Sequence, residues 1–133
     1  TYYSALGESD EKMLLARAIQ MFMPGKSQIW YLDLFAGKND HEAVQRAGES
    51  GHKEINRTNL STDQITEGLK KDVVQKQLAL IRMRNTHKAF SEGAEVAISG
   101  GERSLEIRWE YNSAFATLYV NFESGTYTIV ESK

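Results

Sequence analysis

The sequence predicts an α+β fold in which a helix-rich segment comes first and a small antiparallel sheet follows. Two observations predict it. Apolar residues recur at helical spacing in much of the first two thirds of the chain, and near residues 92–93 their period changes from 3.6 to two. Glycine-rich and polar turns separate the alternating segments that follow. We therefore expect a boundary near residue 91, with residues 1–90 and residues 91–133 as separate parts.

The first 35 residues are typical of the helix-to-strand half of an α/β unit. Ser9 or Asp10 caps a helix, and Pro24-Gly25 ends it. The nearly continuous apolar run from Gln28 to Phe35 then predicts a strand buried on both faces, as in parallel sheets. The aromatic pair Trp30 and Tyr31 is expected to be part of the core of that strand.

The next segment, as far as Leu60, is polar and glycine-rich, with one short helix expected around His41 to Ala47. Ser61 then caps a new helix, and Gln64 three residues later completes a capping box. A longer helix is expected from about Lys71 to Thr86, with an apolar stripe and basic residues in its last turns.

The last 40 residues alternate between apolar and polar positions. The clearest run lies between the Gly100-Gly101 turn and the Asn112-Ser113 turn, and two further strands follow, separated by Ser124-Gly125. This pattern predicts an antiparallel meander with one face exposed to water. Trp109 belongs to the inward-facing positions, where packing is the expected role.

Composition excludes several classes of protein. The chain has 133 residues, of which 41% are hydrophobic and 26% charged, with a net charge of −2. No basic surface field is expected, so nucleic acid is not a predicted partner. No apolar stretch approaches the ~18 residues of a membrane span. The absence of cysteine excludes disulfides and fits a reducing, cytoplasmic compartment.

The chain opens with Thr1-Tyr2-Tyr3-Ser4 rather than methionine, and an amphipathic helix begins almost at once. We expect a piece of a larger protein, although removal of a short leader would leave the same trace.

Several short motifs, taken in order, resemble the sucrose phosphorylase family of the α-amylase superfamily (glycoside hydrolase family 13). They cover roughly Thr1 to Phe90, and the segment after residue 91 matches only in kind, as a C-terminal β domain. The motifs are Tyr2-Tyr3-Ser4-Ala5-Leu6-Gly7, Ala16-Arg17-Ala18, Phe22-Met23-Pro24-Gly25, Ala36-Gly37-Lys38-Asn39-Asp40 and Glu54-Ile55-Asn56-Arg57.

The resemblance implies that residues 1–90 form the last α/β units of a (β/α)8 barrel and that residues 91–133 form the C-terminal β domain. Enzymes of this family transfer glucose with retention, from sucrose to phosphate, giving α-glucose 1-phosphate and fructose. Their catalytic carboxylates come from earlier barrel strands, and a whole barrel needs about 250 residues. We therefore expect no catalytic residue here and an inert chain when it is alone.

Part of the sugar site is expected in the Ile-Asn-Arg motif. By resemblance, Arg57 contacts glucose hydroxyls, and its planar fork of donors suits a diol. The alternative is an ion pair with Glu54 that only pins the loop. Nearby, His52 and Lys53 are two potential cations that could receive a phosphate group, whereas the plainer interpretation is a solvated basic loop.

Other polar residues have a structural alternative at least as strong as a binding role. Asp33 would lie at the catalytic end of the buried strand, or else fix a loop. Asn56 is expected to tie the backbone, and Lys38, Asn39 and Asp40 to form a structured turn.

His41 and His87 have no partner at metal-ligand spacing. No metal, calcium ion or organic cofactor is implied.

Three further hypotheses stay open. Relatives acting on sucrose 6'-phosphate, glucosylglycerol or glucosylglycerate form the first. A non-catalytic carbohydrate-binding or assembly module is the second, and an exposed row of aromatics on the β domain would favour it. The third is self-association of the fragment, with an open strand edge at Ile29 to Phe35 as the seam.

Overall fold

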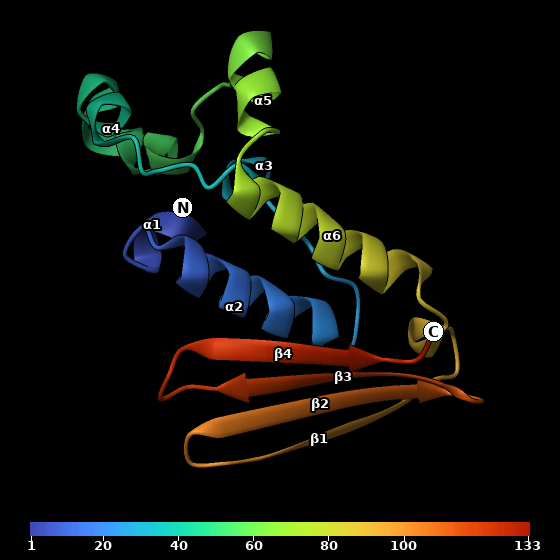
Figure 1. The fold of residues 1–133 in the computed structure, drawn as a ribbon. Coiled ribbons are helices and arrows are strands. Elements are labelled where there is room, and N and C mark those ends of the chain that lie inside the picture. Colours follow the sequence, from blue (N-terminus) through green and yellow to red (C-terminus); the bar gives the residue numbers. More distant parts are fainter. The chain divides into compact units, whose positions relative to one another are not determined.

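The computed structural model describes every residue from Thr1 to Lys133. The chain forms two compact units (Figure 1): residues 1–13 with 28–76 make unit 1, and residues 14–27 with 77–133 make unit 2. Two helices are shared between the units, because the divisions fall after Met13 and after Lys76. The predicted boundary near residue 91, between a barrel part and a β domain, stays a prediction.

Unit 1 consists of short helices joined by polar loops. Its helices, including the first turns of the two shared ones, are α1 (Tyr2–Ala5), α2 (Asp10–Phe22), α3 (Tyr31–Leu34), α4 (His41–Ala47), the 3-10 helix η1 (Gly48–Asn56), α5 (Thr62–Gly68) and α6 (Asp72–Thr86). The predicted short helix at residues 41–47 and the long helix at 71–86 are confirmed. The capping box is confirmed too. The Ser61 hydroxyl accepts from the backbone amide of Gln64, and the side-chain oxygen of Gln64 accepts from the backbone amide of Ser61.

The predicted buried strand at residues 28–35 is wrong. Residues up to Trp30 are extended, but Tyr31 begins the helical turn of α3. Within the run only Leu32 is buried, and the Gly37 amide closes the turn by donating to the Leu32 carbonyl at 2.7 Å. A short apolar run does not distinguish a buried strand from a helical turn. The expected seam for self-association disappears with the strand, because this segment has no strand edge.

Unit 2 contains a four-stranded antiparallel sheet. Its strands are β1 (Glu95–Gly101), β2 (Ser104–Tyr111), β3 (Ala114–Asn121) and β4 (Thr126–Glu131), and they lie side by side in sequence order (Figure 1). In the central row Ile98 faces Ile107, which faces Leu118, which faces Ile129. The predicted meander is therefore confirmed, and the period of two in the sequence corresponds to the two faces of the sheet.

An aromatic cluster forms part of the core of unit 2. The Trp109 indole N–H donates to the Phe22 carbonyl at 2.6 Å, and the Phe90 ring packs edge-on against Phe22. The guanidinium of Arg84 lies over the rings of both Phe90 and Trp109, where burial lowers its pKa. The predicted packing role of Trp109 is confirmed, whereas Tyr119 on the opposite face of the sheet is exposed.

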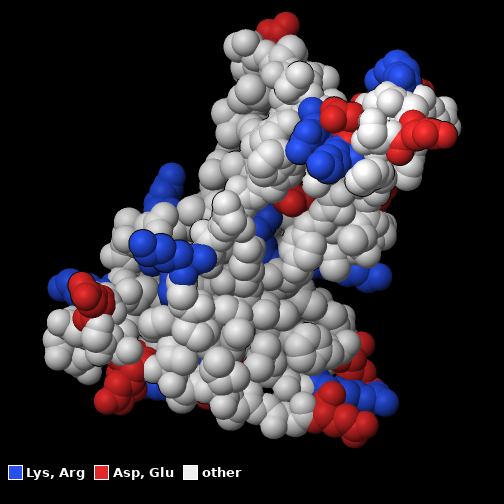
Figure 2. Space-filling view, turned by 180° about the vertical axis from the view of Figure 1, so that it is seen from behind, with Lys and Arg blue, Asp and Glu red and all other residues white.

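Positive and negative side chains are mixed on the surface. On the face shown in Figure 2, basic and acidic groups are scattered and neither sign forms a broad patch. No helix combines the length and the apolar character needed to cross a membrane.

Candidate functional site

The candidate site is the segment from Ile55 to Thr58, which carries Arg57 and lies in unit 1. Its backbone carbonyls are hydrogen-bonded by side chains and by another loop. The Asp40 amide donates to the Ile55 carbonyl at 2.8 Å, and the Trp30 indole donates to the Asn56 carbonyl at 2.9 Å. The segment, which is the end of η1 and the start of the loop after it, is therefore ordered by contacts with residues outside it.

Asp40 joins this segment to α4. Its carboxylate caps the helix by accepting from the Ala43 amide at 2.8 Å, and it also accepts from the Thr58 hydroxyl at 3.3 Å. These donors, the Ala43 amide first, lower the pKa of Asp40 below its usual value near 3.8. Asp40 thus serves as a helix cap and as an anchor for the loop.

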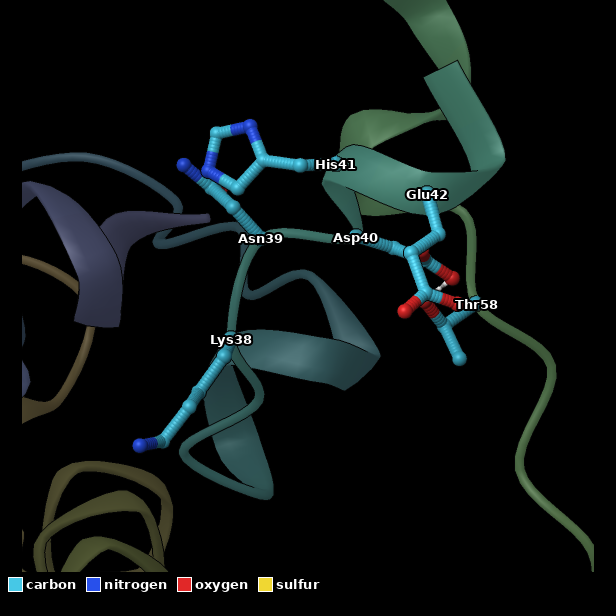
Figure 3. Close-up of a pocket in the computed structure, with 6 residues that line it drawn as sticks. All are labelled: Lys38, Asn39, Asp40, His41, Glu42 and Thr58. Carbon is cyan, nitrogen blue, oxygen red and sulfur yellow. Dashed lines mark hydrogen bonds between the residues drawn. The ribbon is translucent and has the colours of Figure 1, made fainter. Parts of the chain in front are cut away.

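A shallow hollow of about 430 Å³ adjoins these residues (Figure 3). Asn39 and His41 extend to one side of the backbone, Lys38 points away from both, and Asp40 lies with Thr58 (Figure 3). The hollow is lined by Lys38, Asn39, Asp40, His41, Glu42 and Thr58.

The segment Lys38 to Asp40 is a loop held by specific contacts and not the turn that the sequence predicts, since the turn lies earlier, at Phe35 and Ala36. Lys38 forms an ion pair with Glu8 at 2.6 Å, and the backbone amide of Asn39 donates to the Ser4 hydroxyl at 3.0 Å. Together with the Asp40 cap, these contacts hold all three residues in place.

Arg57 itself is exposed and only loosely paired. Its guanidinium lies 3.6 Å from the Glu54 carboxylate, and both side chains are about half exposed. The structure therefore contains the predicted ion pair in a weak form, since exposed pairs contribute roughly 0–1 kcal/mol. The guanidinium donors remain accessible to a ligand.

His52 and Lys53 lie on η1, and both side chains are exposed. Neither makes an ion pair or a side-chain hydrogen bond in the structure. Gly51, just before them, is buried, and a Cβ there would lie 2.6 Å from the Val44 carbonyl oxygen. Close packing of η1 on α4 therefore requires glycine at this position.

Asp33 lies in α3 and not at the end of a strand, so its predicted position is wrong. Its carboxylate accepts from the Tyr2 amide at 2.6 Å, at the start of α1. This contact is the loop-fixing role that the sequence left open.

The sequence predicts that Trp30 and Tyr31 belong to a core, and that prediction is wrong. Their side chains are 46% and 37% exposed, and each donates a hydrogen bond to a carbonyl next to Arg57. No periodicity marks such residues. The signal available in the sequence is chemical, since tryptophan and tyrosine carry a donor on an otherwise apolar ring.

The arrangement offers hydrogen-bond donors and cations around an accessible loop. This chemistry suits hydroxyl groups or phosphate oxygens. No group of three or more His, Cys, Asp or Glu side chains is placed to hold a metal ion.

Known phosphorylases align with nearly the whole of this chain. The chain is 51% identical over 129 residues to the sucrose 6(F)-phosphate phosphorylase of Ilumatobacter coccineus, and the alignment covers 97% of this chain and 24% of that protein. It is 42% identical over 132 residues to the sucrose phosphorylase of Agrobacterium vitis, covering 99% and 26%. The glucosylglycerol phosphorylase of Marinobacter adhaerens is 36% identical over 136 residues, covering 99% and 28%.

A solved structure agrees with these relatives. The crystal structure of sucrose 6F-phosphate phosphorylase from Thermoanaerobacter thermosaccharolyticum matches with a TM-score of 0.92 and 40% identity, over 100% of this chain and 26% of that one. No family model matches the chain. The chain spans about a quarter of the length of the curated relatives that it matches. It therefore belongs to the sucrose phosphorylase family and corresponds to a C-terminal portion of its members.

Proposed function

We propose that this chain is the C-terminal quarter of a retaining phosphorylase that converts sucrose and phosphate into α-glucose 1-phosphate and fructose. The observation that carries the proposal is identity of 35–51% to phosphorylases of glucosides along most or all of the chain. In the proposed parent, residues 1–90 complete a catalytic (β/α)8 barrel and residues 91–133 form its β domain.

The chain alone is proposed to be inert. Retention through two displacements requires two carboxyl groups about 5–5.5 Å apart across the bond that breaks. By the family resemblance these groups lie on earlier barrel strands, outside the residues present here. The contribution of this chain is then to bind and orient the glucosyl group.

Arg57 is the proposed sugar-binding residue. Its guanidinium is exposed and weakly paired, so little is lost when a pair of sugar hydroxyls replaces Glu54 as acceptor. Phosphate, either free or carried on fructose, is the proposed ligand of the exposed side chains of His52 and Lys53. A direct substrate contact by Asp33 is the least supported of these roles, because its carboxylate already accepts from the Tyr2 amide.

Phosphorylated sucrose is a second candidate substrate. The relative at 51% identity is named as a sucrose 6(F)-phosphate phosphorylase, compared with 42% for a sucrose phosphorylase. The exposed side chains of His52 and Lys53 on η1 also suit a phosphate on the fructosyl unit. Glucosylglycerol is a weaker candidate, with a named relative at 36%.

The remaining parts of the proposal concern environment and assembly. We place the enzyme in the cytoplasm, with sugars and phosphate as its partners and without an organic cofactor or metal. Self-association of the isolated chain is part of the same proposal, and sedimentation at rising concentration tests it: a strictly monomeric species would contradict it.

The test of the function is release of glucose 1-phosphate by the full-length parent and by this chain, side by side. Sucrose and sucrose 6'-phosphate are each supplied with phosphate, and glucosylglycerol serves as a third substrate. We expect the parent to be active with one of the first two and the chain to be silent. A parent inactive on all three would overturn the proposal, and activity in the chain alone would overturn the placement of the carboxylates.

A further inference from the structure

Two adjacent aromatic side chains donate to the carbonyls on both sides of Arg57. The Trp30 indole N–H donates to the Asn56 carbonyl at 2.9 Å, and the Tyr31 hydroxyl donates to the Thr58 carbonyl at 2.8 Å. The peptide unit that precedes Arg57 and the one that follows Thr58 are therefore both held, by two residues adjacent in the sequence.

The two donors are themselves well anchored. Tyr31 is the first residue of α3 and Trp30 is its N-cap, and the Leu32 side chain that follows is only 1% exposed. The Leu34 amide donates to the Trp30 carbonyl at 3.1 Å, and the two rings lie 4.9 Å apart, tilted by 48°. Exposed aromatic rings fixed in this way have few rotamers left, so their donors stay aimed at the loop.

Asp40, the N-cap of α4, holds the same segment from a second side. The backbone amide of Asp40 donates to the Ile55 carbonyl at 2.8 Å, and its carboxylate accepts from the Thr58 hydroxyl at 3.3 Å. Trp30, Tyr31 and Asp40 thus make four hydrogen bonds with residues 55–58, whereas the side chain of Arg57 has only its 3.6 Å pair with Glu54. The direction in which Arg57 leaves the backbone is set by these ties to the main chain.

We propose that Trp30 and Tyr31 are positioning residues for Arg57 that orient its guanidinium for the glucosyl group. The inference rests on the proposed role of Arg57 in sugar binding. A long side chain loses much rotamer freedom on binding, and a backbone already fixed in place reduces what remains to be ordered. Small misplacements of a binding group lower the rate strongly when orientation matters in the reaction.

The activity test uses the full-length protein and variants that remove one donor each. Tyr31→Phe removes the hydroxyl and keeps the ring, and Trp30→Phe removes the indole N–H. We expect each to lower kcat/KM by about threefold to tenfold, the effect of losing one neutral hydrogen bond. Tyr119→Phe is the matched control, an exposed tyrosine of β3 in unit 2, and it should leave kcat/KM unchanged.

A double-mutant cycle separates positioning from a general structural role. If Tyr31 acts through Arg57, then adding Tyr31→Phe to Arg57→Ala causes no further loss of kcat/KM. A merely structural role would lower activity by the same factor in both backgrounds, and that result would overturn the inference.

Hydrogen exchange supplies a readout that does not depend on activity. In Tyr31→Phe and Trp30→Phe, amides of residues 54–58 should exchange faster, while those of β2 and β3 keep their protection. Unchanged exchange at residues 54–58 would contradict the proposed tie.

The outcomes also separate this inference from the function on which it rests. If Arg57→Ala keeps full activity, the sugar role of Arg57 fails and the inference fails with it. If Arg57→Ala loses activity while Tyr31→Phe and Trp30→Phe do not, the inference alone is overturned.

Discussion

The two units of this chain are built by different means. Unit 2 is held by apolar packing, with a sheet whose central strands carry the buried residues Ile107, Trp109, Leu118 and Val120. Unit 1 contains fewer buried apolar side chains, and its loops are held by side chains that bond to the main chain, as at Trp30, Tyr31 and Asp40. The exposed cations and donors of the candidate site all lie in unit 1.

Because the two units are held together differently, substitutions in them should have different consequences. Apolar packing is non-directional and tolerates volume-conserving exchange, whereas a hydrogen bond to a particular carbonyl requires one donor in one place. A change in unit 2 should therefore appear mainly as lost stability. A change in unit 1 should appear mainly as a displaced loop, and hence as altered binding.

The largest expected loss of stability comes from Leu118→Ala in the central row of the sheet. Leu118 is fully buried, so the variant loses both transfer free energy and packing, about 2–5 kcal/mol. Urea denaturation of the chain measures this change. Val130→Ala on β4 is the control, since Val130 is 47% exposed, and it should change the free energy of unfolding by less than about 0.5 kcal/mol. Equal losses in the two variants would contradict the packing account of unit 2.

A smaller and more local effect is expected from Gly51→Ala. The new methyl group would lie 2.6 Å from the Val44 carbonyl oxygen, so η1 must move away from α4, at about 1–3 kcal/mol. Hydrogen exchange should show faster exchange in residues 48–58 while the sheet stays protected. If the sheet amides lose protection equally, the two units do not respond separately and the comparison fails.

Ser61→Ala should be milder still. It removes the hydroxyl that accepts from the Gln64 amide at 3.2 Å, and half of the capping box with it. We expect a loss of about 1 kcal/mol, read from the midpoint of urea unfolding. Thr62→Ala, one residue later on an exposed position, is the control, and an equal loss there would show that the cap is not the cause.

The smallest expected effect is a pH dependence at Asp40. Because the folded state lowers the pKa of Asp40 below 3.8, its ionised form stabilises the fold above that pH. This contribution is lost as the pH falls through the lowered folded value. Asp40→Asn keeps an acceptor for the helix cap but cannot titrate there, so its stability should fall less steeply on acidification below about pH 4. Parallel curves for the two proteins would exclude Asp40 as the titrating group.

The sheet could be predicted from the sequence because alternation at residues such as Ile107 and Trp109 has one structural meaning. The helices at residues 10–22 and 72–86 could be predicted for the same reason, from their period of 3.6. Residues 28–35 could not, since eight nearly continuous apolar residues fit a strand or a turn of helix equally well. Tertiary hydrogen bonds decide between them, and local pattern does not contain those.

The candidate site could be predicted only in part. A motif in the sequence indicates Arg57, and the ion pair with Glu54 is the alternative role that the sequence also predicts. Trp30 and Tyr31 were missed because their hydrogen-bond acceptors, at Asn56 and Thr58, lie 26 and 27 residues further along the chain. A contact of that sequence separation leaves no periodic trace.

The most direct test of the account is the effect of Arg57→Ala and Arg57→Lys on glucose 1-phosphate formation by the full-length protein. If Arg57 holds the glucosyl group with a planar fork of donors, both variants should lower kcat/KM, by about tenfold or more for alanine, and lysine should restore little. The substrate used should be whichever of sucrose and sucrose 6'-phosphate the wild type accepts. Wild-type activity in Arg57→Ala would contradict the assignment of the sugar site to this loop.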